Sequence, residues 1–263
     1  MPVRVRSNGQ SLDDFVREAA ILRSKANDLA EVEPAYYKPD SNNGYPPDDI
    51  ILNGLVLNLP LYKLTGGTFK SIDPYHTTFT NTGTIWTPQA RTFDGIDDQI
   101  TGNNTALDFT TSAFTLEVWA KFTILATAPY IINKTTGTET VGYEMYVQAN
   151  GSLTLGTCQT TPAQQYSYTA AGRITTGAWF HCMATRSGAT GLTYVDGVDR
   201  TATFGVHVNP SDPSAQLLRL GYLGAGTPNF ILTGSIGEAR IYNRALSAVE
   251  VAHNYNVTRW RYK

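Results

Sequence analysis

From residue 50 onward, the chain is a succession of short segments in which apolar and polar residues alternate. The clearest segment is AFTLEVWAKF, residues 113–122. Its apolar positions are Phe114, Leu116, Val118 and Ala120, and the intervening positions are Thr115, Glu117, Trp119 and Lys121. A period of two places successive side chains on opposite faces of a β-strand. This segment is therefore predicted to be a strand with one face in a hydrophobic core.

Turn residues separate these segments at regular intervals. Asn150-Gly151 divides GYEMYVQANGSLTLGT into two alternating runs, and Asp196-Gly197 does the same further along. Asn-Gly and Asp-Gly are strong hairpin signals because both residue pairs tolerate positive φ angles. About a dozen such strands predict an all-β fold, a two-sheet antiparallel jelly-roll sandwich. Ser247 and the residues after it predict one short helix near the end of the chain.

Composition narrows the classes of function. The chain has 263 residues and a formal net charge of -2, and this near-neutral balance gives no indication of the basic face that nucleic-acid binding requires. No apolar run reaches the length needed to cross a bilayer, which predicts no membrane insertion. The first fifteen residues do not have the pattern of a secretory signal. Cys158 and Cys182 are predicted to be buried free thiols rather than a disulfide.

The N-terminal part has a different period. Residues 11–33 predict a helix, with Ser11 as N-cap and Pro34 as terminator. Its apolar residues follow a 3,4 spacing that forms a narrow seam: Leu12, Phe15, Ala19, Leu22, Ala26 and Leu29. Two interpretations stay open, a helix docked on its own β domain and an anchor for self-association or assembly. The predicted division is an arm and helix at 1–34, a Pro/Tyr-rich linker at 35–48 and the sandwich at 49–263.

The stretch RTFDGIDDQI, residues 91–100, contains three carboxylates: Asp94, Asp97 and Asp98. An Asp before Gly95 is ordinary turn chemistry, so the stretch predicts a bend between two strands. Calcium is the second interpretation, since this cation takes carboxylate and carbonyl oxygens, with Asn103 or Asn104 as further donors. A catalytic acid pair is the third.

Four stretches together resemble a known group of proteins. They are RTFDGIDDQI, AFTLEVWAKF, the hairpin WFHCMATR…LTYVDGV and the closing element FILTGSIGEARIYNRALSAVEV. In this order, they resemble the laminin-G-like, or concanavalin A-like lectin/glucanase, jelly-roll superfamily, over residues 49–256. The resemblance implies two curved antiparallel sheets, with ligands on the concave face or at the loop rim, often beside calcium. The superfamily includes lectins, glucanases, adhesion domains and virion surface proteins, so it does not decide the function.

Glycoside hydrolysis by the superfamily's route needs acids at alternating positions of one strand. Here the candidate strand has Glu117, Trp119 and Lys121, with a lysine where an acid is required. The chain is therefore predicted not to be an enzyme, with a glycoside hydrolase as the weakest alternative. Trp119 and Glu117 are instead candidate ligand-binding residues, because an indole on the polar face of the strand can stack on a sugar. Trp119 could equally lie under a covering loop.

The leading functional hypothesis joins these parts. DDIILNGLVLNLPLYKL, leading into a laminin-G-like domain, resembles structural proteins of tailed bacteriophages and environmental viruses. The hypothesis is a virion structural protein, a capsid decoration or a tail or fibre component, made in the host cytoplasm and displayed on the virion surface. Its expected partners are other virion proteins, further copies of itself and glycans. The alternative is a secreted or cell-surface, calcium-dependent carbohydrate-binding module.

Overall fold

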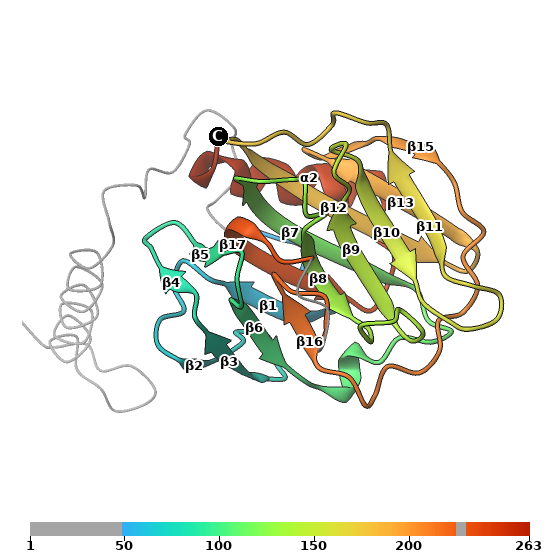
Figure 1. Ribbon diagram of the computed structural model, residues 1–263, viewed down its shortest axis with the longest axis horizontal. Coiled ribbons are helices and arrows are strands. Elements are labelled where there is room, and N and C mark those ends of the chain that lie inside the picture. The colour runs from blue at the N-terminus through green and yellow to red at the C-terminus, as the bar shows by residue number, and fades with distance from the viewer. Residues whose placement is uncertain (1–48, 225–229) are drawn as a thin grey trace, which may run out of the picture. The chain divides into compact units, whose positions relative to one another are not determined.

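The computed structural model describes residues 49–224 and 230–263, which belong to a compact unit of residues 40–263. Two antiparallel sheets make up this part of the chain, and Figure 1 shows them stacked face to face. Seventeen strands are present in the described residues, more than the sequence predicted, because several are only two or three residues long. The predicted two-sheet antiparallel sandwich is confirmed.

Sheet A is organised around its longest strand, β17 (Thr233–Tyr242). β17 pairs with β7 (Phe114–Phe122) along one edge, and with β1 (Leu55–Pro60) and β5 (Arg91–Asp94) along the other. The remaining strands of sheet A are β4 (Ile85–Trp86), β12 (Trp179–Ser187), β13 (Thr190–Val195) and β14 (Val198–Asp199). The order is β14-β13-β12-β7-β17-β5-β4, with β1 beside β17.

Sheet B has the order β15-β11-β10-β9-β8-β16-β6-β3-β2. Its central strands are β8 (Tyr130–Lys134), β9 (Tyr143–Val147), β10 (Leu153–Thr157) and β11 (Gln165–Thr169). The others are β2 (Thr68–Lys70), β3 (Thr78–Thr82), β6 (Gln99–Gly102), β15 (Thr201–Thr203) and β16 (Leu218–Leu220). A short 3-10 helix, η1 (Thr105–Leu107), follows β6.

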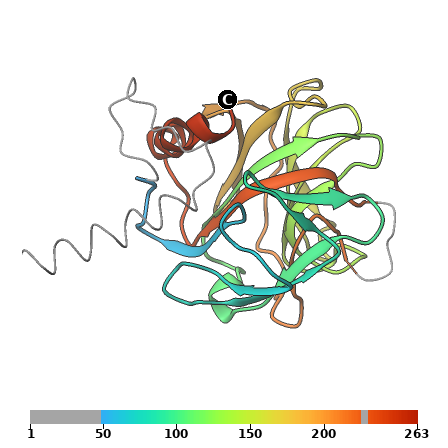
Figure 2. The ribbon, with the colours of Figure 1, turned by 90° about the vertical axis from the view of Figure 1, so that its left-hand side faces the viewer.

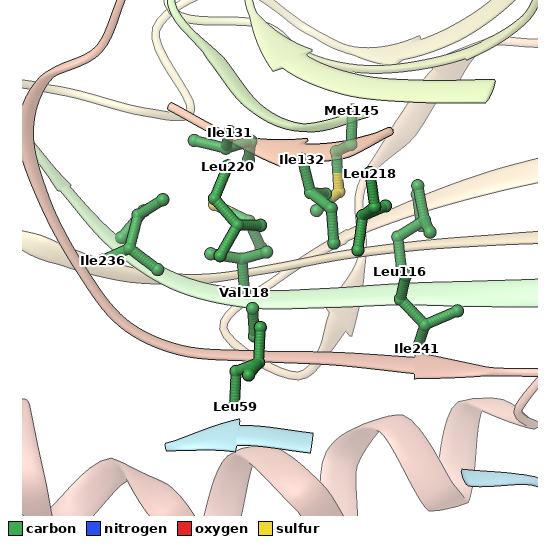
Figure 3. Packing of buried hydrophobic residues seen from close by; sticks show 14 of the residues in the cluster. Leu59, Leu116, Val118, Ile131, Ile132, Met145, Leu218, Leu220, Ile236 and Ile241 are labelled. Atoms are coloured by element: carbon green, nitrogen blue, oxygen red, sulfur yellow. The ribbon is translucent and has the colours of Figure 1, made fainter. Parts of the chain in front are cut away.

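The hydrophobic core lies between the two sheets. Figure 3 shows Leu116 and Val118 of β7 and Ile236 and Ile241 of β17 in one layer of this core. The facing layer comes from sheet B: Ile131, Ile132, Met145, Leu218 and Leu220. The alternation predicted for β7 is confirmed, since its apolar positions all enter this core and the intervening ones face the other side of sheet A.

The outer side of sheet A is covered by the C-terminal helix. Helix α2 (Ala248–Thr258) begins at the predicted N-cap Ser247, which forms a capping box with Glu250. It continues into the 3-10 helix η2 (Arg259–Arg261). Figure 2 shows α2 lying to one side of the strands. Asn254 of α2 hydrogen-bonds to Glu117 of β7, which ties the helix to the middle of sheet A.

Other local predictions have direct outcomes. Gly151 has φ +80° in the turn between β9 and β10, which confirms the predicted hairpin. Cys158 and Cys182 are buried free thiols. No helix in the described part of the chain is long and apolar enough to cross a membrane. The predicted N-terminal helix with its seam, and the linker at 35–48, lie outside the described residues.

Candidate functional site

The three aspartates lie in one loop, here called the acid loop (residues 94–98). This loop connects β5 of sheet A to β6 of sheet B. The Asp94 carboxylate accepts a hydrogen bond from the Ile96 N–H at 2.8 Å, and Gly95 has φ +81°. The Asp98 carboxylate in turn accepts from the Asp94 N–H at 2.8 Å. These contacts confirm the predicted bend and its turn chemistry.

The acid loop also brings carboxylate oxygens together. One oxygen from each of Asp94, Asp97 and Asp98 lies within 4.8 Å of the other two. Asp98 is buried while the other two are exposed. Burial raises the pKa of Asp98, and the charges of Asp94 and Asp97 raise it further, against the hydrogen bond from the Asp94 N–H. None of the ion pairs within residues 49–224 and 230–263 includes these aspartates.

This arrangement fits a hard cation. Calcium prefers six to eight oxygen ligands, including carboxylates, and would relieve the repulsion among the three acids. The Thr233 hydroxyl lies close to Gly95, since a Cβ at that glycine would be 2.0 Å from Thr233 Oγ1. The two asparagines considered as further donors lie past the far end of β6. Asn104 caps η1, and Asn103 binds Lys134 and Ser214, so neither belongs to the acid loop.

Trp119 lies on the outer face of sheet A, under the C-terminal segment. Its ring is fully buried and stacks on Tyr262, with 4.6 Å between ring centroids. The indole N–H donates to Thr258 Oγ1 at 2.8 Å. The structure thus gives Trp119 a different role from the predicted sugar platform. It holds α2 and η2 on the sheet, and no part of its ring surface is free for a sugar.

Glu117 is buried beside Trp119 in a polar network. Its carboxylate contacts Arg240 Nη1 at 2.8 Å and Asn254 Nδ2 at 2.8 Å, with His181 Nε2 at 3.0 Å. Burial opposes its ionisation, but Arg240 and His181 outweigh that effect and lower the pKa of Glu117 to about 2. An ionised, fully paired and inaccessible carboxylate is suited to holding α2 in place. It is not placed to act as a general acid or to contact a ligand.

The outer face of sheet B carries aromatic residues that the sequence analysis did not single out. We call Tyr130, Tyr146, Tyr166 and Tyr168 the tyrosine face. Tyr130 and Tyr146 stack with 4.6 Å between centroids, and Tyr166 meets Tyr146 edge-on at 6.3 Å. Tyr146, Tyr166 and Tyr168 are half-buried, so the tyrosine face is accessible from outside. The one α-helix among the described residues lies on the other sheet.

Together, the fold and these faces define a lectin-like β-sandwich. The family model described as the Concanavalin A-like lectin/glucanases superfamily matches residues 94–252, which is more than half of the chain. The chain therefore belongs to this superfamily. The match includes the acid loop, β7 and the first part of α2. No curated protein matches the chain.

Solved structures show the same fold at low identity. The binding domain of Paraclostridial Mosquitocidal Protein 1 is 16% identical, with a TM-score of 0.60 over 77% of this chain and 52% of that chain. The binding domain of Botulinum Neurotoxin serotype G is 12% identical, with a TM-score of 0.60 over 76% of this chain and 50% of that chain. Trypanosoma rangeli sialidase is 17% identical, with a TM-score of 0.56 over 77% of this chain and 32% of that chain. The chain thus spans about half or less of each structure.

Proposed function

We propose that this protein is a surface component of a virus particle, a capsid decoration or a part of a tail or fibre, and that its sandwich binds glycans without catalysis. The observation that carries the proposal is the contrast between the two outer faces of the sandwich. Sheet A is closed by α2 and η2, whereas sheet B presents the partly exposed tyrosine face. Tyrosine rings offer both an apolar surface and a hydrogen-bonding hydroxyl, which suits sugar binding.

Two further points support glycan binding without catalysis. The chain belongs to a superfamily named for lectins, and two of the similar structures are binding domains of toxins. The carboxylate that occupies the candidate catalytic strand, Glu117, is ionised and sealed beneath α2. A hydrolase needs a carboxylic acid that reaches the substrate, and Glu117 does not meet that requirement.

The virion role rests on the N-terminal segment. Residues 1–34 carry an apolar seam at coiled-coil spacing, and a proline-rich stretch follows before the sandwich. An isolated helix of this length is marginal in water, so the seam calls for a partner. We assign that partner to a neighbouring subunit or to the particle shell, with the sandwich displayed outward.

A calcium-dependent lectin is the second candidate, favoured by the acid loop. Asp94, Asp97 and Asp98 supply carboxylate oxygens close together at the junction of the two sheets. A bound calcium ion would stabilise the loop and could coordinate sugar hydroxyl groups directly. In this candidate, the sandwich is the whole functional unit and the N-terminal segment has no assembly role.

A glycan array probed with the full chain, with and without a chelator, tests the binding proposal. Binding that survives the chelator supports recognition by the tyrosine face, and binding abolished by the chelator favours the calcium lectin. Binding to no glycan would overturn both candidates. Capsid and portal genes beside the coding sequence would support the virion role. Loss of particle association on deleting residues 1–48 would support the anchor, and retained association would refute it.

A further inference from the structure

Glu144 occupies an unusual position on the outer face of sheet B. On β9 it lies directly opposite Asn133 of β8 on one side and Gly156 of β10 on the other. A Cβ at Gly156 would lie 2.6 Å from Glu144 Oε1, so the glycine leaves the space that the carboxyl group occupies. Met145 and Tyr143, its neighbours along the strand, point into the core instead.

The carboxyl group of Glu144 is fully buried, and neither of its oxygens has a hydrogen-bond partner among the described residues. Two more buried oxygens are without a hydrogen-bond partner among the described residues: Asn133 Oδ1, on the residue opposite Glu144, and Thr135 Oγ1, two residues further along. We call these three side chains the Glu144 cluster. The amide N–H group of Asn133 donates elsewhere, to the carbonyl of Tyr222. The Glu144 cluster therefore presents acceptor oxygens, with the weak thiol donor of Cys158 beside Glu144 and Thr135.

The surroundings of Glu144 favour the uncharged form of its carboxyl group. Burial raises the pKa of Glu144 well above its ordinary value, and the charge of Glu139 raises it further. None of the ion pairs in the described parts of the chain includes either glutamate. Unpaired acceptors next to two carboxyl groups are best satisfied by a group that carries both positive charge and N–H donors.

Glu139 and the tyrosines lie beside this cluster. The Glu139 carboxylate accepts hydrogen bonds from Tyr130 Oη at 2.5 Å and Tyr166 Oη at 2.9 Å, and from Gln164 Nε2 at 3.1 Å. Its φ of +54° is a left-handed value that a non-glycine residue adopts at a cost, as residues at binding sites often do. The rings of Tyr130, Tyr146 and Tyr166 add faces that attract cations.

We infer that the Glu144 cluster, with the tyrosine rings beside it, binds the ammonium group of an amino sugar. The inference rests on the proposed glycan-binding function and names its ligand class. An ammonium group offers three N–H donors for the acceptors of Glu144, Asn133 and Thr135, and the sugar ring would lie on the half-buried Tyr146 and Tyr166. Because the Glu144 carboxyl is buried, the side chains that cover it must move aside for the ligand to enter.

The same observations argue against two other occupants. A metal ion would need several anionic or imidazole ligands, and within the described residues three such side chains converge at the acid loop instead. A neutral sugar would supply hydroxyl donors but no positive charge, so the buried Glu144 carboxyl would stay uncharged. An ammonium group supplies both the N–H donors and the positive charge that lets Glu144 ionise.

The test compares a glucosamine oligosaccharide with its N-acetylated counterpart, by calorimetric titration of the full chain at a pH where the amine is protonated. The two ligands share one sugar skeleton and differ in the charge on nitrogen. We expect the free amine to bind about tenfold more tightly or better, the scale of one charge-assisted hydrogen bond. Equal affinities, or tighter binding of the acetylated form, would overturn the inference while leaving glycan binding in place.

Glu144→Gln provides the second arm. The amide keeps the shape of the side chain and supplies donors to the neighbouring oxygens, so we expect an unchanged or higher unfolding temperature together with loss of the preference for the amine. Asp212→Asn, at an exposed acid that contacts Ser214, is the matched control and should keep the preference. A preference that persists in Glu144→Gln would refute the inference. A second outcome would also refute it: calcium, and not the glucosamine oligosaccharide, raises the unfolding temperature of the wild type, and Glu144→Gln abolishes that rise.

Discussion

Glu117 Oε1 and Arg240 Nη1 lie 2.8 Å apart, and both side chains are buried beneath the C-terminal helix. Around them, Glu238 pairs with Arg240 and Arg261, so the network joins β7, β17 and η2. A buried ion pair adds little net stability compared with apolar packing, but removing one partner leaves an uncompensated charge. The network therefore commits the C-terminal segment to one position on sheet A.

Glu117→Gln should destabilise the protein substantially. It removes a buried charge that faces Arg240 and weakens the contacts with His181 and Asn254. The expected loss in the free energy of unfolding is about 3 kcal/mol, as for other broken buried pairs. Denaturant unfolding measures it. Lys263→Gln, which breaks the partly exposed pair with Asp196, serves as the control and should cost less than about 1 kcal/mol. Similar losses in the two variants would contradict the role given to the network.

Trp119→Phe should lower stability without affecting glycan binding. The substitution removes the indole hydrogen bond to Thr258 and part of the stacking on Tyr262. We expect a loss of about 1–3 kcal/mol, because the Thr258 hydroxyl loses a buried partner and the smaller ring leaves space. Thermal unfolding and a glycan array on the same preparation measure both effects. Reduced glycan binding at an unchanged unfolding temperature would restore Trp119 as a ligand-binding residue.

Features that depend on near neighbours in the chain were predictable from the sequence. The alternation in residues 113–122, the Asn150-Gly151 hairpin and the Ser247 cap depend on neighbours within a few positions, and the structure confirms each. The sequence placed Trp119 correctly on the polar face of its strand. It did not show what covers that face, because Thr258 and Tyr262 lie about 140 residues further along the chain.

Glu144 shows the same limit more clearly. A single glutamate in an alternating strand has the same local pattern whether it faces solvent or is buried. Its burial depends on Gly156 in the next strand, and its electrostatic environment depends on Glu139 in a separate loop. The tyrosine face was equally hidden, since Tyr130, Tyr146 and Tyr166 come from three strands or strand ends that only the register of sheet B brings together. Pairing of β8 with β9 and β11 with β10 was the missing information.

Calcium should raise the unfolding temperature through the acid loop. At a free calcium concentration 100 times the dissociation constant, binding to the folded state alone adds about 2.7 kcal/mol. Asp98→Asn should abolish this gain. In chelator, the same variant should unfold at an equal or higher temperature, because the raised pKa of Asp98 means that its charge opposes folding above that pKa. Thermal scans with calcium and with chelator measure both effects.

Asp212→Asn is the control for that experiment, since it changes an exposed acid that contacts Ser214 rather than the acid loop. It should keep the full response to calcium. A calcium response that is equal in the wild type and Asp98→Asn would place any bound ion elsewhere. No response in the wild type would remove calcium from the proposed function.

His207 should make the protein less stable as the pH falls from 6.5 toward 4. The ring is buried between Thr157 and Ser167, with Nδ1 3.0 Å and Nε2 2.9 Å from their hydroxyl oxygens. Burial lowers the pKa of His207 to about 4, and the charge of Arg186 contributes to the lowering. The unfolded chain therefore binds this proton at a higher pH than the folded chain does. Stability is fully present above about pH 6.5, and about 3 kcal/mol is lost by about pH 4.

The measurement is the free energy of unfolding between pH 5 and 7, in the wild type and in His207→Gln. Between pH 5 and 7 the wild type should gain more stability than the variant as the pH rises, even if the variant is less stable throughout. Glu117, whose pKa is lowered to about 2, acts in the same direction only below about pH 4.5, outside the window. Parallel curves for the wild type and His207→Gln would show that the buried imidazole does not control stability in this range.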